Sequence, residues 1–323
     1  MTDLNLLYSG KVRDVYELNN DLLLLEATDR TSGFNKHICN IPNKGVLLNM
    51  MSQFWFDKTK HIIPNHLIYS DDRFSIVKKC KPFKVEVIVR GYITGNTETS
   101  LWTHYKNGSR NYCGVVFPDG LVKNQKLEYP VVTPTTKDEN DRPITPQEIV
   151  DSELMTEDQM RYIFKKALEL YKFGAEYAEN RDLLLVDTKY EFGLDKNNNI
   201  LLIDEVHTCD SSRYWLKNTY LQKMVNGESP DKFDKDQVRD WVKEQCDPYT
   251  EEIPEPPKNI IDLVYNSYYR FYKKVTEEDI YYNNKTIRNI LNDTDSLTNK
   301  NKKVVVLYGS QKDETFINKL CYN

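Results

Sequence analysis

The feature of the sequence that most constrains its fold is a pair of apolar segments that carry ionisable residues at alternate positions. Leu183–Phe192 and Ile200–Val206 are separated by a turn-rich stretch, and they predict a buried β-hairpin. Because alternate residues of a strand share one face, Asp187, Lys189 and Glu191 project together. We therefore expect a charged face on an otherwise apolar hairpin.

The second segment also carries charges, because Asp204 and Glu205 follow Ile203 directly. Burying such groups costs free energy unless they pair with opposite charges or bind a metal. One interpretation is a solvated outer face on which Lys189 pairs with a neighbouring carboxylate. The other is a Mg²⁺ site, in which one or two carboxylates supply hard oxygen ligands and nucleotide phosphates and water complete the shell.

A glycine beside two cations marks a tight turn near the N-terminus. The turn contains Gly10 and Lys11 and lies between the strand-like segments Leu6–Tyr8 and Val12–Leu18. A residue without Cβ lets backbone N–H groups approach a phosphate closely. Lys11 and Arg13 are two residues apart on a strand and point to the same side. The alternative is a hairpin turn with a structural role only.

Two loops combine an arginine with small polar residues. Asp210–Arg213 suits a phosphate monoester because a guanidinium binds phosphate through two hydrogen bonds, although Asp210 could instead cap a short helix. Arg90–Thr97, with two glycines, is a second candidate anion loop. The polar cluster Asp29–Ser32 follows a strand and fits either a ligand contact or a helix cap.

Charge and hydropathy exclude several classes of function. The 44 basic and 49 acidic residues give a formal net charge of −5, which provides no electrostatic footprint for nucleic acid or an anionic membrane surface. No apolar run approaches the roughly 20 residues that a membrane span needs. The six cysteines lie far apart without a CxxC pair, as expected of reduced thiols. We expect a cytoplasmic protein whose anionic ligands are held by a few placed cations.

Periodicity predicts helices over Val46–Lys60, Thr156–Asn180, Asp234–Glu244 and Asn259–Lys273. The stretch Gly114–Pro146 is rich in Pro, Thr and turn residues, and it predicts long ordered loops.

Six segments, in this order and spacing, resemble the SAICAR synthetase family of de novo purine synthesis, and the resemblance extends from Leu7 to about Tyr272. The segments are Gly10–Tyr16, Ala27–Phe34, Val89–Gly95, Thr133–Lys137, Asp187–Gly193 and Asp204–Trp215. The resemblance implies an α+β fold with an antiparallel N-terminal sheet, whose hairpin covers the phosphates of ATP as in kinases. A larger α/β lobe follows, and ATP occupies the cleft between the lobes.

The family implies an ATP-dependent ligase that joins the carboxylate of carboxyaminoimidazole ribotide (CAIR) to the amine of L-aspartate through an acyl phosphate. The products are SAICAR, ADP and phosphate. Two other functions stay open: a related ATP-dependent phosphotransferase, and a non-catalytic nucleotide-binding descendant. Residues 1–112 would form the nucleotide-binding lobe and 113–276 the substrate and metal lobe, with a linker over 277–303 and a separate tail over 304–323.

The resemblance also implies roles for individual residues. The nucleotide would be bound by Gly10, Lys11, Val12, Arg13, the adenine-lining segment Lys81 to Val85, and Lys137, which lies near the nucleotide or aspartate. Mg²⁺ would be held by Glu191 and Asp204. The ribotide phosphate would be bound by Arg90 and Arg213, and further substrate contacts would come from Asp29, Ser32, Asn96 and Ser212. The catalytic residues around the imidazole and its carboxylate would be Asp187, Lys189 and Asp210.

Three residues depart from the family pattern, and none is a proposed metal ligand. Asn96 replaces the usual Ser, Asn35 replaces an Asp, and Cys209 replaces a Pro. The tail segment Lys303–Asp313 resembles the first strand and phosphate loop of the aminoimidazole ribonucleotide carboxylase/mutase family. It implies a remnant or the edge of a second domain, with a purine-pathway carboxylase, fused or separate, as partner. The alternative is a chance strand followed by a Gly-Ser turn.

Overall fold

The computed structural model describes residues 4–34, 36–138, 141–233 and 236–291. The described residues up to Asn284 form one compact unit, and the described residues from Lys285 to Leu291 belong to a separate one. In the described part of the second unit, the backbone N–H of Thr286 donates to Oδ1 of Asn289 at 2.9 Å. The expectations for Asn35 and for the tail beyond residue 291 lie outside the described residues.

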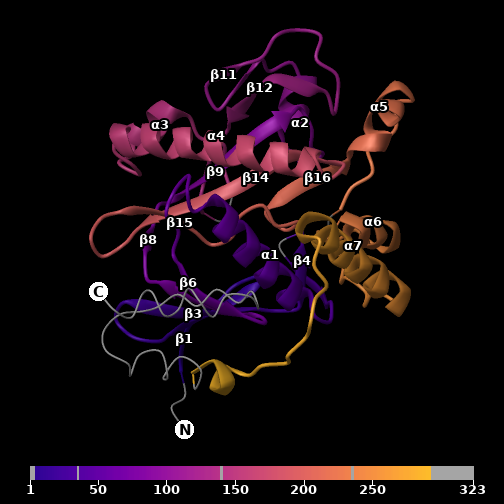
Figure 1. Ribbon diagram of the computed structural model, residues 1–323. Helices are drawn as coiled ribbons and strands as arrows, with labels where there is room; N and C mark the ends of the chain where they lie inside the picture. Colours follow the sequence, from indigo (N-terminus) through magenta and orange to yellow (C-terminus); the bar gives the residue numbers. More distant parts are fainter. Residues whose placement is uncertain (1–3, 35, 139–140, 234–235, 292–323) are drawn as a thin grey trace. The chain divides into compact units, whose positions relative to one another are not determined.

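A five-stranded antiparallel sheet forms the N-terminal part of the first unit (Figure 1). In spatial order its strands are β1 (Asn5–Ser9), β2 (Arg13–Glu17), β3 (Leu22–Ala27), β7 (Phe74–Lys78) and β6 (Leu67–Asp71). Helix α1 (Lys44–Thr59) packs against β3, β6 and β7. A small hairpin of β4 (Arg30–Gly33) and β5 (Lys36–Asn40) leads into this helix.

A seven-stranded sheet is built around β14 (Leu183–Leu194), the first strand of the predicted hairpin. Its central path runs through β12 (Lys126–Val132), β9 (Val85–Tyr92), β14 and β15 (Ile200–Ile203). Strand β13 (Thr135–Thr136) pairs with β9, and β8 (Lys81–Pro82) and β16 (Ser212–Leu216) pair with β14. All pairings of β14 are antiparallel, so segments far apart in sequence meet along one strand.

The predicted long helix is α4 (Glu157–Glu179), which lies across β9, β12 and β14 (Figure 1). A capping box starts it: the Thr156 side chain accepts from the backbone of Gln159, whose side chain in turn accepts from the backbone of Thr156. The remaining elements are α2 (Leu101–Lys106), β10 (Asn111–Tyr112), β11 (Val115–Val116), α3 (Pro146–Asp151), α5 (Lys217–Val225), α6 (Asp236–Gln245) and α7 (Lys258–Thr276).

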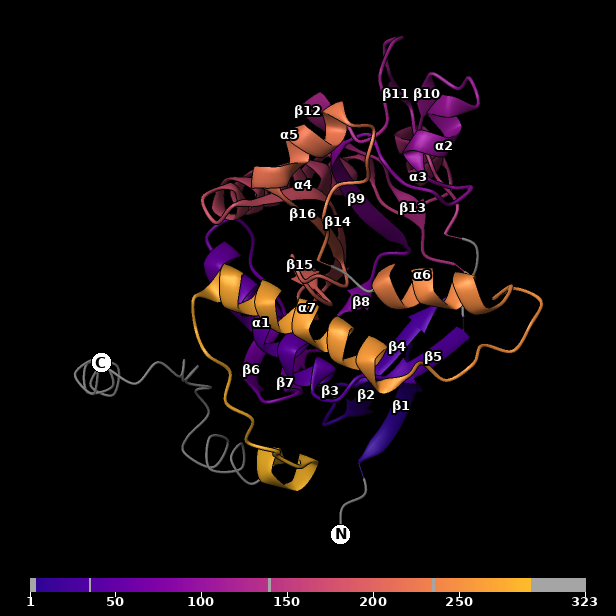
Figure 2. The same ribbon diagram turned by 90° about the vertical axis from the view of Figure 1, so that its right-hand side faces the viewer.

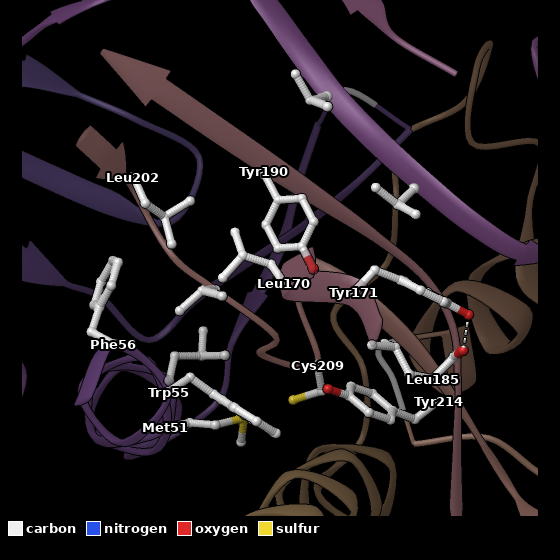
Figure 3. Close-up of a cluster of buried hydrophobic side chains, with 14 of the residues drawn as sticks. Met51, Trp55, Phe56, Leu170, Tyr171, Leu185, Tyr190, Leu202, Cys209 and Tyr214 are labelled. Carbon is white, nitrogen blue, oxygen red and sulfur yellow. Dashed lines mark hydrogen bonds between the residues drawn. The ribbon is translucent and has the colours of Figure 1, made fainter. Parts of the chain in front are cut away.

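Helices α1 and α4 and strand β14 share one hydrophobic core. Figure 3 shows Trp55 of α1 in the same cluster as Leu170 of α4 and Tyr190 of β14, and all three side chains are fully buried. The hydroxyl of Tyr171 donates to the backbone oxygen of Leu185 at 2.6 Å, which ties α4 to β14. Helix α7 packs against α1 and α6 (Figure 2), and its buried side chains belong to the same core.

The predicted helices are present, with ends shifted by at most three residues. The expectation of loops over Gly114–Pro146 is wrong in part, because β12 and β13 lie within it. In the part of the chain that the structure describes, no helix is long and apolar enough to cross a membrane.

Candidate functional site

The turn between β1 and β2 meets the end of the β14–β15 hairpin through Arg13. Its guanidinium lies 2.6 Å from Oδ1 of Asp204 and 3.2 Å from Oε2 of Glu205. Burial alone would lower the pKa of Arg13, but the carboxylates of Glu205 and Asp204 outweigh burial and raise it. The contact brings together two segments that the sequence pointed to separately.

Lys189 is the centre of a second ionic group. Its Nζ lies 2.7 Å from Oε1 of Glu86 on β9 and 3.0 Å from Oε1 of Glu191. Lys137 contacts the other oxygen of Glu191. Burial would lower the pKa of Lys189, but the nearby carboxylates of Glu191, Asp204 and Glu86 raise it, so the side chain stays positively charged.

Asp204 follows directly after β15, with φ of 65° in the left-handed region. Burial would raise its pKa, but the charges of Arg13, Lys189 and Lys137 outweigh burial and lower it. The carboxylate is therefore ionised at neutral pH and surrounded by cations. Non-glycine residues in this region are concentrated at functional sites, where the surrounding structure enforces the backbone conformation.

Glu191 and Asp204 are the candidate metal ligands, and the strand register places them close together. Glu191 lies opposite Ile203, and Asp204 is the next residue along the chain. Among the described residues there is no group of three or more His, Cys, Asp or Glu side chains arranged to hold a metal. Two carboxylates fit Mg²⁺, which usually takes one or two protein carboxylates together with substrate phosphates and water.

Arg90 and Arg213 converge on Asp187. In the sheet, Asp187 lies between them as the cross-strand partner of both. Its Oδ2 is 3.2 Å from Nη1 of Arg90 and 3.6 Å from Nη1 of Arg213. Nε of Arg90 donates to Oγ1 of Thr133 at 2.8 Å, which fixes the plane of that guanidinium. The arrangement holds two cations on either side of one carboxylate.

The loop before β16 is held to the same strand. Oγ of Ser212 donates to Oγ1 of Thr188 at 2.8 Å, and the backbone N–H of Lys189 donates to the carbonyl of Ser211 at 2.9 Å. Asp210 is buried, and its carboxylate accepts from Lys44 and Tyr268. The loop therefore has a defined conformation beside Lys189.

The segments expected to bind the nucleotide are the β1–β2 turn, β8 with the start of β9, and Lys137. The N–H of Gly10 donates to the carbonyl of Arg13 at 2.7 Å, which closes the β1–β2 turn, and Lys11 is exposed at its tip. Val12 is half-buried against the core. In the expected adenine segment, Lys81 is exposed on β8 and Val85 is buried on β9. The N–H of Lys137 donates to the carbonyl of Lys84 at 3.1 Å, which joins the two segments.

Two other predicted residues, Asp29 and Asn96, form hydrogen bonds within the protein. Oδ1 of Asp29 accepts the N–H of Gly45 in the first turn of α1 at 3.0 Å and lies 3.5 Å from Nη1 of Arg73. Ser32 is half-buried on β4. Oδ1 of Asn96 is exposed and accepts from Nζ of Lys123 at 2.6 Å. Cys209, the residue in place of the usual Pro, is buried.

Sequence reasoning missed Glu86, Lys44 and Tyr268 as members of the site, and it noted Glu205 beside Asp204 without giving it a role. Glu86 had a recognisable signal, because it lies four residues before Arg90 and shares its face of the strand. Lys44 and Tyr268 had no such signal. Each lies in a helix, and the residues next to it in the sequence are apolar or polar residues without a recognisable motif.

Comparison with known proteins identifies the family of the chain. Residues 6–256 match the family model described as SAICAR synthetase. The phosphoribosylaminoimidazole-succinocarboxamide synthase of Legionella pneumophila (strain Lens) is 49% identical over 278 residues, which cover 85% of this chain and 89% of that protein. The chloroplastic synthase of Arabidopsis thaliana is 47% identical over 270 residues, covering 83% of this chain and 66% of the relative.

Solved structures give the same result. The SAICAR synthase of Saccharomyces cerevisiae in complex with SAICAR has a TM-score of 0.75 and 35% sequence identity, covering 86% of this chain and 96% of that one. A type-2 SAICAR synthetase in complex with ADP has a TM-score of 0.64 at 24% identity, covers 85% and 99% of the two chains, and supports the fold alone. With its motifs gathered around β14 and its likeness to these proteins over most of its length, the chain belongs to the SAICAR synthetase family.

Proposed function

We propose that the chain uses ATP and Mg²⁺ to condense the carboxylate of CAIR with the amine of L-aspartate, through the residues described above. One observation carries the proposal: two adjacent groups of cations lie along β14. The first contains Arg13, Lys137 and Lys189, and the second contains Arg90 and Arg213. Two groups suit two separate phosphate-bearing reactants in one site.

The chemistry explains why so many charges are needed. A carboxylate is a poor electrophile because its leaving group would be oxide. Phosphoryl transfer from ATP to the CAIR carboxylate gives an acyl phosphate, and the aspartate amine then attacks the carbonyl carbon and expels phosphate. All three reactants are anionic, so the protein contributes mainly positioning and charge neutralisation. A chain of net charge −5 can do this because the positive charge is local.

The nucleotide side of the site is assigned to the β1–β2 turn and its neighbours. Backbone N–H groups around Gly10 and the side chains of Lys11 and Arg13 would bind the phosphates. Lys137 would bind the nucleotide or the carboxylates of aspartate. The adenine would lie along the segment from Lys81 to Val85.

Glu191 and Asp204 would hold Mg²⁺ between the protein and the phosphates. The bound ion would supply charge neutralisation on the transferring phosphoryl group. These carboxylates form ion pairs with Lys137, Lys189 and Arg13. The same three cations would contribute to binding the anionic phosphates beside the ion.

The ribotide side is assigned to Arg90 and Arg213, with Ser212 as a hydroxyl donor to the phosphate. Asp187 orients the two arginines, and Lys189, kept positively charged by its neighbours, would face the carboxylate that is activated. Protonated Lys189 acts as a fixed cation and not as a base.

The test is phosphate release from ATP in the presence of Mg²⁺, CAIR and L-aspartate, with each omitted in turn. Glu191→Ala and Asp204→Ala are measured beside Glu244→Ala, an exposed carboxylate on α6 that serves as control. We expect release to require all components, to be lost in both site variants and to be kept in the control. Release without aspartate would indicate a phosphotransferase instead. Nucleotide binding without any release would indicate a non-catalytic protein.

A further inference from the structure

A buried lysine that the roles above do not use lies next to the site. Lys44 is the first residue of α1, and its side chain is 1% exposed. Its Nζ donates to Oδ2 of Asp210 at 2.9 Å and to the backbone oxygen of Arg30 at 3.2 Å. A positive charge at a helix N-terminus opposes the helix dipole, and burial removes its hydration. The ion pair with Asp210 offsets both costs.

The second oxygen of Asp210 also has a partner within the protein. The hydroxyl of Tyr268, on α7, donates to Oδ1 at 2.5 Å. The ammonium of Lys44 lies 5.6 Å from the centre of the Tyr268 ring, within cation–π range. We call these three residues, Lys44, Asp210 and Tyr268, the Asp210 clamp. It joins α1, α7 and the loop before β16, three segments that are distant in the sequence.

The clamp fixes the start of the ribotide-phosphate loop. The backbone N–H groups of Asp210 and Ser211 both donate to Oγ1 of Thr208, at 3.3 and 3.2 Å. Both the side chain and the backbone of Asp210 are therefore restrained. These restraints fix the path of the backbone from Asp210 to Ser212 and Arg213. A displacement of Asp210 would move the guanidinium that is meant to bind phosphate.

The clamp also connects to the nucleotide side. The guanidinium of Arg30, whose backbone oxygen accepts from Lys44, donates to the backbone oxygen of Gly10 at 2.9 Å and forms an ion pair with Asp14 at 2.7 Å. Lys44 is thus in contact both with the support of the β1–β2 turn and with Asp210. A buried ion pair is weak evidence for stability, because apolar side chains of similar size often stabilise a core equally well. What such a pair adds is a fixed orientation of the two charged side chains.

We propose that Lys44 and Tyr268 are positioning residues, which hold Asp210 and, through it, the loop bearing Ser212 and Arg213 in the conformation that binds the ribotide phosphate. The inference rests on the proposed function and deepens it. Asp210 acts on loop geometry in this proposal, since both of its carboxylate oxygens have partners inside the protein.

The principal variant is Tyr268→Phe, which removes one oxygen atom from the clamp and leaves the ring in the core. Its matched control is Tyr269→Phe, the next residue of α7, whose hydroxyl donates to Asp279 at the surface. We expect Tyr268→Phe to raise the KM for CAIR roughly tenfold, the size expected for a hydrogen bond to a charged group. The KM for ATP, and every constant of the control, should stay within about twofold of wild type.

A double variant separates positioning from general destabilisation. If Tyr268 acts through Arg213, the effect of Tyr268→Phe on the KM for CAIR should shrink when Arg213→Lys is already present. An unchanged KM for CAIR, an equal rise for ATP and CAIR, or full additivity with Arg213→Lys would each overturn the proposal. Lys44→Met should raise the KM for CAIR in the same way as Tyr268→Phe. If Lys44→Met does not fold, the result for Tyr268→Phe alone tests the proposal.

Failure of the proposed function has a different signature, because the wild type itself would then show no CAIR-dependent phosphate release. In that case calorimetric binding of inorganic phosphate, compared between wild type and Tyr268→Phe, tests the clamp. Weaker phosphate binding in the variant would support it, and equal binding would overturn it.

Discussion

The ammonium of Lys189 lies 2.7 Å from Oε1 of Glu86, a carboxylate on the neighbouring strand β9. Glu191 provides a second carboxylate at 3.0 Å on β14 itself. The lysine is therefore held from two strands, and the protein itself sets its direction. Preorganised charge of this kind is worth more than a mobile one, because no reorganisation is needed during the reaction.

The first prediction concerns Glu86. In Glu86→Gln the amide oxygen can still accept from Lys189, but one of the two negative charges that orient it is lost. We expect kcat/KM for CAIR to fall roughly tenfold with the fold intact, since charge-assisted hydrogen bonds are the stronger ones. Glu128→Gln, at an exposed position on β12, is the control and should behave as wild type. Equal kinetics for both variants would contradict the role given to Glu86.

The second prediction concerns close packing at the start of α1. A Cβ on Gly45 would lie 2.1 Å from the backbone oxygen of Ala27, so Gly45→Ala forces β3 and α1 apart. We expect a loss of about 3 kcal/mol in the free energy of unfolding, measured in urea. Gly108→Ala is the control, because its Cβ would meet open space. The only expected loss of stability, about 1 kcal/mol, comes from placing an alanine at φ of +96°. Similar losses of unfolding free energy in the two variants would show that α1 can shift away from β3 at little cost and would contradict the prediction.

The hairpin and the long helix could be predicted because each has a repeating pattern: ionisable residues at alternate positions in the hairpin, and apolar residues every three or four positions in the helix. The residues Asp187, Lys189 and Glu191 do share one region of the structure, as the alternation indicated. Strand β12 was missed for a physical reason. It lies at the end of the sheet's central path, most of its residues are exposed or half-buried, and it contains Pro130, which removes a hydrogen-bond donor. Its sequence therefore lacks the apolar run of an inner strand.

The partners of the site residues could not be predicted from local patterns. The alternation showed which face Asp187 occupies but not that Arg90 and Arg213 would flank it, because that depends on the register of three strands. The Lys44–Asp210 pair joins residues 166 positions apart, and only the packing of α1 against the rest of the core brings them together. Family resemblance pointed to Asp210, and nothing in the sequence pointed to its partners.

The third prediction is a loss of stability in mild acid. Burial lowers the pKa of His66 to about 3 and that of His207 to about 3. In the unfolded chain a histidine titrates near 6.5, so between pH 6.5 and about 3 the unfolded state binds protons that the folded state does not. Stability is complete above pH 6.5 and falls as the pH drops, by about 2 kcal/mol per histidine at pH 5.

Urea unfolding of His66→Gln at pH 7 and pH 5 checks this expectation. The loss between the two pH values should be smaller than in wild type by about 2 kcal/mol, because one of the two protons is no longer taken up on unfolding. His37→Gln removes an exposed histidine and should keep the wild-type loss. The same loss in all three proteins would mean that His66 is protonated in the folded state.

The fourth prediction concerns the buried pair of Arg90 and Asp187. Arg90→Met removes the cation 3.2 Å from Asp187 and leaves that buried carboxylate with Arg213 at 3.6 Å. We expect a loss of about 3 kcal/mol in the free energy of unfolding, since breaking a buried pair leaves a carboxylate whose charge Arg213 alone does not fully compensate. Arg161→Met breaks an exposed pair on α4 and should cost less than about 1 kcal/mol.

A second substitution distinguishes the energetic role of Arg90 from its role in binding. Adding Asp187→Leu to Arg90→Met removes the uncompensated carboxylate, so the double variant should regain most of the lost stability, because apolar pairs can replace buried ion pairs. It should still show no CAIR-dependent phosphate release, since the cation that would bind the ribotide phosphate is absent. Recovered stability together with recovered activity would mean that the phosphate is bound without Arg90, and the second group of cations along β14 would then have to be assigned to a different reactant.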